Sequence, residues 1–94
     1  MVRVLIERHI AEGMVEEFQL ALRNMRLQAA PREGYISGES LHAAADPHHF
    51  YAISTWNSAA EWGAWQKSDA RLKVMAVIGP MLEEPEKITV LKPA

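Results

Sequence analysis

The feature that most constrains the fold is the order in which two hydrophobic periods follow each other along the chain. Residues 2–10 are rich in β-branched side chains that alternate in direction, which predicts a strand. From about residue 14 to residue 29 the apolar positions are spaced three and four apart, which predicts a helix with one buried stripe. The stripe consists of Val15, Phe18, Leu22, Met25 and Ala29.

Two further strands follow this helix. Residues 35–42 predict a weak, polar strand, in which Gly38 indicates a bulge or a close backbone approach. Residues 43–49 contain Asp46-Pro47 and predict a hairpin turn. Residues 50–56 alternate clearly and predict a third strand, with Phe50 and Trp56 on one face.

The last part of the chain predicts a second helical region in two pieces and a short final strand at residues 88–91. Ser58 with Glu61 has the spacing of a capping box at the helix start. A second piece begins at Ser68 or Asp69, and Gly79-Pro80 is expected to kink or restart it because proline cannot donate to the preceding turn. Its expected apolar positions are Leu72, Met75, Ile78 or Val77, and Leu82.

The resulting order is β-α-β-β-α-β, which predicts a ferredoxin-like α+β fold with a four-stranded antiparallel sheet. Residues 1–94 are expected to form a single domain. Both helices would cover one face of this sheet. The first strand nevertheless offers Val2, Val4 and Ile6 on one side and Leu5 on the other, so a second apolar face remains. We therefore predict a homodimer formed through the sheet face, and a lysine at Val4 or Ile6 is expected to disrupt it.

Composition excludes several classes of protein. The chain has no cysteine, which excludes a disulfide scaffold and a thiolate metal site. A formal net charge of −2 lacks the basic excess of a nucleic-acid-binding protein. The apolar run at residues 4–6 is too short for a signal peptide or a membrane span, so we expect a soluble, cytoplasmic protein without membrane or nucleic-acid partners.

The four histidines do not predict a metal site. His48 and His49 are adjacent and diverge on an extended turn, while His9 and His42 belong to other strands. Glu7 and His9, two apart on one strand, share a face, and a carboxylate there can orient an imidazole as a catalytic base. The alternative is that this strand simply ends in water.

All three tryptophans fall within residues 56–65. Trp62 and Trp65 are three residues apart, so both can face the sheet or line one cavity. Core packing and a ligand pocket are both compatible with this pattern. A helix break beside Trp65 favours the pocket, since a break loosens local packing.

The stretches 53–58 and 65–69, with Trp56, Trp65 and Ser68-Asp69, resemble the antibiotic biosynthesis monooxygenase superfamily, as does the segment 31–35 after the first helix. The resemblance covers nearly the whole chain. It implies a dimeric α+β barrel, and its members include cofactor-independent oxygenases of quinols and aromatic polyketides, as well as heme-degrading enzymes.

The heme-degrading branch has an asparagine near the end of strand one and a histidine ten residues after the tryptophan. Here those positions are Glu7 and Met75, neither of which is an obvious iron ligand. Many quinol-type members carry a glutamate where this chain has Ser54. We therefore predict no cofactor.

The resemblance implies a cofactor-independent monooxygenase acting on a small aromatic or quinol-type substrate. Glu7 and His9 are the candidate catalytic base. The candidate substrate-binding residues are Trp62, Trp65, Phe18, Leu22 and Met75. The alternatives are a non-catalytic dimeric module that binds a small apolar ligand or heme, and a purely structural dimer.

Overall fold

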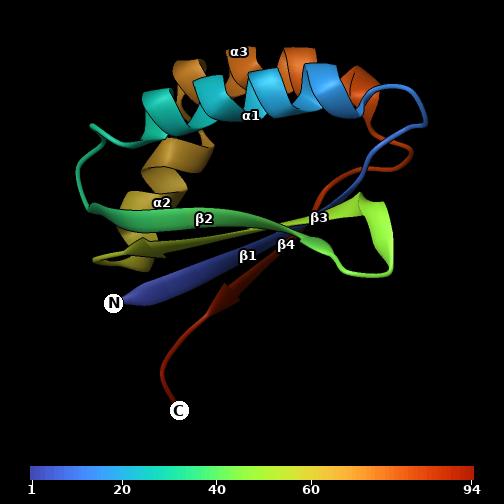
Figure 1. The fold of residues 1–94 in the computed structure, drawn as a ribbon. Coiled ribbons are helices and arrows are strands. Elements are labelled where there is room, and N and C mark those ends of the chain that lie inside the picture. Colours follow the sequence, from blue (N-terminus) through green and yellow to red (C-terminus); the bar gives the residue numbers. More distant parts are fainter.

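The protein, described over residues 1–94 by a computed structural model, consists of a sheet with helices on one side (Figure 1). The elements in chain order are β1 (Val2–His9), α1 (Val15–Ala29), β2 (Tyr35–Ala43), β3 (Asp46–Trp56), α2 (Ala59–Gln66), α3 (Asp69–Ile78), the 3-10 turn Gly79–Met81 and β4 (Lys87–Leu91). This order confirms the predicted β-α-β-β-α-β sequence, with the second helical region divided into α2 and α3.

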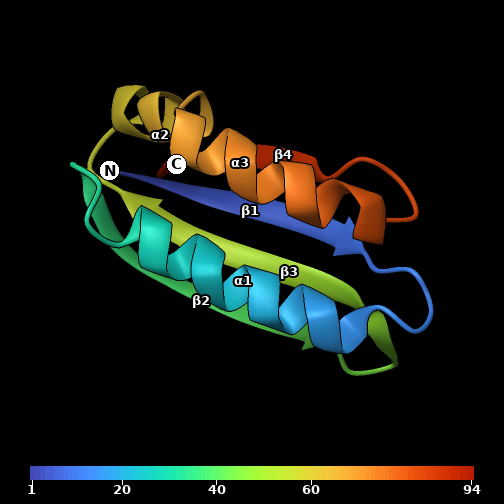
Figure 2. The ribbon, with the colours of Figure 1, turned by 90° about the horizontal axis from the view of Figure 1, so that it is seen from above.

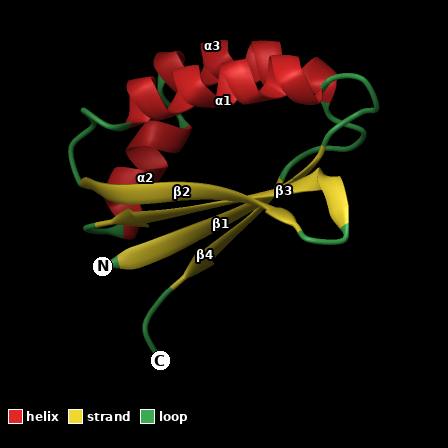
Figure 3. Ribbon diagram, in the orientation of Figure 1, coloured by secondary structure: helices red, strands yellow, loops and turns green.

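The four strands form one antiparallel sheet in the order β2-β3-β1-β4, as the ferredoxin-like prediction requires. Seen from above, α1 runs over the β2–β3 half of the sheet and α3 over the β1–β4 half (Figure 2). The helices α1 and α3 lie on one side of the sheet, α2 runs from their layer down beside one end of the sheet, and the other face has no covering layer (Figure 3). No helix is both long enough and apolar enough to cross a membrane.

The hairpin between β2 and β3 is tighter than predicted. Ala43 pairs with Asp46, so the turn contains only residues 44 and 45. Asp46-Pro47 therefore begins β3 instead of forming the turn. A proline is tolerated there because the ladder is irregular between His42 and Ala43, where the missing N–H disrupts no regular pairing.

The core lies between the helices and the sheet, and it settles the orientation of β1. Val2, Val4 and Ile6 are buried under the helices, and Val4 is fully inaccessible. The predicted stripe of α1 is confirmed for Phe18 and the three buried residues after it, Leu22, Met25 and Ala29. The prediction that lysine at Val4 or Ile6 would probe a dimer contact was wrong, because both side chains belong to the core of the chain itself.

The inward face of α3 also differs from the prediction. Arg71, Val74 and Ile78 are buried, whereas Leu72 and Val77 are 57% and 55% exposed. The reason is a distant partner, because Arg71 donates to Glu86 at 2.9 Å, and this pairing allows the arginine to occupy the inward face in line with Val74 and Ile78. The predicted break is confirmed, since the helix passes into a 3-10 turn at residues 79–81.

The uncovered side of the sheet, here called the open face, carries apolar side chains from all four strands. Leu5 lies opposite Ile53 in the β1–β3 ladder, and both are partly exposed. Tyr51 and Leu41 are paired across β3 and β2, and Leu91 is at the end of β4. The structure thus shows the two-sided sheet that the sequence indicated.

Candidate functional site: a tryptophan-lined cavity

A cavity of about 70 Å³ lies between the helical layer and the β2–β3 half of the sheet. Its walls include the three tryptophans Trp56, Trp62 and Trp65, contributed by β3 and α2. α1 contributes Leu22 and Met25 from its buried stripe. Residues from α1, β3 and α2 therefore meet at this cavity.

The cavity exists because the sheet beneath it carries small side chains. Ala52 and Ser54 occupy the helix-facing positions of β3 between Phe50 and Trp56. Their neighbours on β2 are Ser40 and Gly38, which pair with Ala52 and Ser54 respectively. Three short side chains and a glycine in adjacent positions leave space that the larger helix residues do not fill.

Tyr35 closes one side of this hollow. Its ring packs edge-on against Trp56, with centroids 5.3 Å apart. Its hydroxyl lies over Gly38, where a Cβ atom would stand 2.6 Å from the oxygen. The close approach and the bulge between Tyr35 and Ser37 confirm the prediction made for this glycine.

The indoles differ in their surroundings. Trp56 is 1% exposed and donates its Nε1–H to the Ser54 hydroxyl at 3.0 Å. Trp62 packs edge-on against Trp56 at 5.9 Å, and the Arg71 guanidinium lies 5.6 Å from its ring centroid. Trp65 has the Arg32 guanidinium at the same distance.

Two buried arginines meet one carboxylate next to Trp62. Arg8 donates from Nε to one Glu86 oxygen at 3.0 Å, and Arg71 donates from Nη2 to the other at 2.9 Å. The side chains of Arg8 and Arg71 are 3% and 5% exposed, and both residues line the cavity. Burial lowers the pKa of the Arg8 guanidinium from its ordinary value, and the Glu86 carboxylate opposes that shift.

This cluster was missed at the sequence level, although weak signals for it exist. Arg8 continues the buried positions of β1 two residues after Ile6. Arg71 follows three residues after Ser68, the residue that caps α3. An arginine is seldom fully buried without a partner, so neither position suggests a core residue until Glu86 is placed beside it.

The structure brings together some of the predicted binding residues and separates others. Trp62, Trp65 and Leu22 line the cavity. Phe18 is fully buried against Phe50 and does not line it. Met75 packs partly buried against the core and is not among the lining residues either.

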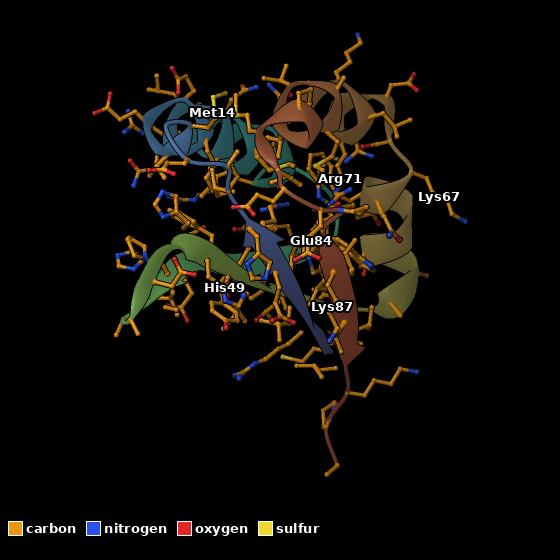
Figure 4. The ribbon with its side chains drawn as sticks, turned by 90° about the vertical axis from the view of Figure 1, so that its right-hand side faces the viewer. Met14, His49, Lys67, Arg71, Glu84 and Lys87 are labelled. Atoms are coloured by element: carbon orange, nitrogen blue, oxygen red, sulfur yellow. The ribbon has the colours of Figure 1, made fainter.

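Glu7 and His9 lie on the open face, on the side of the sheet away from the cavity. Their cross-strand partners are Tyr51 and His49. The rings of His9 and His49 stack at 4.0 Å, and His49 Nε2 stands 3.6 Å from a Glu7 oxygen. Figure 4 shows His49 on the sheet and Arg71 between the helices and the sheet. A base role for Glu7 and His9 remains an untested prediction that applies to a substrate on the open face and not to one in the tryptophan-lined cavity.

The donor groups of the chain do not fit heme or a metal ion. No three histidine, aspartate or glutamate side chains are close enough together to hold a metal. The two positions compared with the heme-degrading pattern, Glu7 and Met75, both lie outside the cavity lining. A hollow of about 70 Å³ is also far below the 300 Å³ or more typical of pockets for drug-sized ligands.

Comparison with known proteins shows one relative in sequence and several in fold. A protein of Streptomyces coelicolor, the 42.8 kDa protein in the whiE locus, is 26% identical over 87 residues. The match covers 93% of this chain but 22% of that relative, so the chain spans about a fifth of the relative's length.

Two solved structures illustrate the shared fold. A conserved protein from Methanosarcina mazei superposes with a TM-score of 0.93 at 15% identity, covering 99% of this chain and 92% of that one. SnoaB, a cofactor-independent oxygenase from Streptomyces nogalater crystallised as a point mutant, gives a TM-score of 0.85 at 12% identity, covering 98% and 92%. At these identities the likeness shows the fold alone.

The family assignment comes from the sequence itself. The model of the antibiotic biosynthesis monooxygenase family matches residues 1–77, which include β1, α1, the β2–β3 hairpin, α2 and most of α3. All three tryptophans and both buried arginines lie within the matched range. The chain therefore belongs to the antibiotic biosynthesis monooxygenase family.

Proposed function

We propose that the protein is a cofactor-independent monooxygenase of a small aromatic or quinol-type substrate, bound in the tryptophan-lined cavity. The observation that carries the proposal is the hollow itself, in which Trp62 and Trp65 present aromatic surface above the short side chains of Ala52 and Ser54. Indole faces bind planar aromatic rings through stacking and edge contacts. Family membership and the oxygenase activity named for SnoaB support the reaction type.

The chemistry requires an electron-rich substrate and a dry site. A substrate anion donates electrons to dioxygen, after which a ring CH₂ and O₂ become a ring C=O and water. The substrate itself supplies the electrons. The cavity contributes aromatic walls that are largely shielded from water, since Trp62 and Trp65 are 4% and 3% exposed, and it contributes orientation of the ring.

The cavity measures about 70 Å³, whereas an engineered cavity of about 150 Å³ admits benzene. Binding even a single ring therefore requires the walls to move apart. The wall best placed to move is the edge strand β2 with Tyr35, because β2 is hydrogen-bonded on one side only.

Oxygen uptake with a panel of quinols tests the proposal, and Ala52→Leu is the informative variant. The added side chain fills the cavity from its floor, so we expect uptake to be lost while circular dichroism still reports the native fold. Ala60→Leu on the exposed side of α2 makes the same change outside the cavity and should retain activity. Equal activity of both variants would contradict the proposal.

The oxygen-uptake assay also shows whether the substrate binds in the cavity or on the open face. Glu7 and His9 cannot reach a ring in the cavity, because the sheet lies between them and the tryptophans. We expect Glu7→Gln and His9→Ala to keep wild-type rates. Loss of activity in these variants, with Ala52→Leu unaffected, would place the substrate on the open face.

The alternative function is a binding module without turnover. Ligand binding in the cavity with no oxygen uptake for any quinol would favour it. Stoichiometric heme binding with a sharp Soret band would instead overturn our preference against heme.

We also propose that the protein is a homodimer through the open face. Leu5, Ile53 and Leu41 form an apolar area that no element of this chain covers. Burying such an area against a second copy would remove it from water in a two-fold arrangement. This is the dimeric α+β barrel that the family resemblance implies.

A further inference from the structure

The buried charges around the cavity do not balance. Arg8 and Arg71 share a single carboxylate, that of Glu86, and all three groups are largely removed from water. A guanidinium stays protonated in proteins, so the cluster holds two positive charges against at most one negative charge. An uncompensated charge at a buried site is costly unless an anion is supplied.

Of the two arginines, Arg71 is the one with an unpaired hydrogen-bond donor. Its Nη2 donates to Glu86, but its Nε is buried and has no hydrogen-bond partner. Arg8 differs, because both its Nε and its Nη2 contact the same Glu86 oxygen. An unpaired buried donor is rare in native structures and calls for a partner that the chain itself does not provide.

The surroundings of Arg71 define the shape of that partner. The guanidinium lies 5.6 Å from the Trp62 ring centroid, and both residues line the cavity with Trp65. An aromatic ring in the hollow would therefore meet indole surface and a charged, planar donor together. Arginine pairs with oxyanions in planar fork geometry, which suits a substituent in the plane of a ring.

We propose that the cavity selects an aromatic molecule bearing an anionic oxygen, a carboxylate or a phenolate, and that Arg71 is the residue that pairs with it. The inference rests on the cavity being the ligand site of the proposed function. It adds a specificity: the ligand is bound as an anion, and a phenol would be bound preferentially in its ionised form. That form is the electron-rich state that reacts with dioxygen.

Binding to the wild-type protein gives the first test, with tryptophan fluorescence as the readout because all three indoles line the cavity. Benzoate and benzamide are single-ring probes of nearly equal shape that differ in charge. We expect benzoate to bind about tenfold or more tightly, the difference that a charge-assisted hydrogen bond makes. Equal affinity would overturn the proposal.

The phenolate arm uses 4-nitrophenol, whose visible band reports its ionisation. We expect the protein to lower the apparent pKa of the bound phenol and so to raise the ionised fraction at a fixed pH. Preference for benzoate without this shift would identify the natural ligand as a carboxylate. Chloride or phosphate that competes as well as benzoate would show a site for inorganic anions only and would overturn the proposal.

Two variants then test whether Arg71 is the residue that pairs with the anion. Arg71→Gln leaves Arg8 and Glu86 as a balanced pair, so the variant should fold, and we expect it to bind benzoate and benzamide alike. Arg32→Gln is the matched control, because Arg32 also lies 5.6 Å from an indole centroid, that of Trp65, but does not contact Glu86. It should keep the preference for benzoate. A preference that survives Arg71→Gln, or is lost in Arg32→Gln alone, contradicts the assignment.

The outcomes separate this inference from the proposed function. Anion-selective binding without oxygen uptake would support the inference while the monooxygenase assignment fails. Oxygen uptake by a neutral substrate, unaffected by Arg71→Gln, would support the monooxygenase and overturn the inference.

Discussion

At the scale of single residues, Trp62 and Trp65 look alike by exposure and differ in their neighbours. Both indoles line the cavity, but Trp62 also packs against the Trp56 ring and lies under Arg71, whereas Trp65 has Arg32 beside it. We expect Trp62→Ala to cost about 3–5 kcal/mol of unfolding free energy, as for a packed aromatic. Trp65→Ala should cost clearly less, because Trp65 lines the cavity without an aromatic ring packed edge-on against it, as Trp56 is against Trp62.

Chemical denaturation of both variants measures this difference, and Trp65→Phe is the milder companion because it retains an aromatic wall. Equal and large losses at both positions would show that Trp65 is simply a core residue. That result would favour the purely structural interpretation of the tryptophans.

Gly38 gives a second prediction at this scale. A methyl group there would stand 2.6 Å from the Tyr35 hydroxyl, so Gly38→Ala should displace the tyrosine ring. Because that ring packs against Trp56, we expect a change in the near-UV circular dichroism without loss of the far-UV signal. A variant with an unchanged aromatic spectrum would show that Tyr35 does not depend on the glycine.

At the scale of secondary-structure elements, the junction between α2 and α3 holds the site together. The Ser68 hydroxyl donates to the Trp65 carbonyl at 2.7 Å and accepts the Arg71 N–H at 3.2 Å. One side chain therefore sets both the end of the helix that carries Trp65 and the start of the helix that carries Arg71.

We expect Ser68→Ala to lower the unfolding free energy by about 1 kcal/mol and also to weaken benzoate binding. Ser58 caps α2 by accepting the Glu61 N–H at 3.2 Å, and Ser58→Ala is the matched control. It should cost similar stability and leave benzoate affinity largely unchanged. If the two variants weaken binding equally, the junction has no special part in the site.

The elements also show what sequence patterns can and cannot predict. The stripe of α1 was predictable because its apolar residues recur with helical spacing from Val15 to Ala29. The inward face of α3 was not, because its first buried residue is Arg71, and hydrophobic spacing assigned that face to Leu72 instead. A buried arginine follows from a distant partner, here Glu86, which no local pattern contains.

The candidate site was likewise predictable from the sequence only in part. Trp62 and Trp65 were predictable as one aromatic surface from their separation of three residues on a helix. Glu7 and His9 were correctly placed on one face of β1, but their position relative to the tryptophans depends on which face the helices cover. Hydrophobicity alone left that open, since Val4 and Leu5 are both apolar.

At the scale of the whole molecule, we expect a lysine substitution to have different consequences on the two faces of the sheet. Ile53 lies on the open face and is partly exposed, so Ile53→Lys should leave the chain folded and shift the protein from dimer to monomer. Val4 is fully buried under the helices, so Val4→Lys should unfold it, because a buried unpaired charge costs several kcal/mol, of order 3 or more.

Light scattering gives the mass, and circular dichroism reports the fold of each variant. A wild-type protein that is monomeric at micromolar concentration would reject the dimer. A folded, dimeric Ile53→Lys variant would show that the contact between copies lies elsewhere.

The position of β1 has a consequence for how the chain acquires its structure. β1 precedes the other three strands of the sheet in the chain, yet it lies inside the sheet, with Val2 paired to Trp56 and Arg3 to Leu91. Contacts between such distant residues slow folding, because a long loop must close before they form. α1 can form early from local interactions, but the strand before it can pair on one edge only after β3 has been made, and on its other edge only after β4. Both edges of β1 are therefore paired only once the last of the four strands is in place.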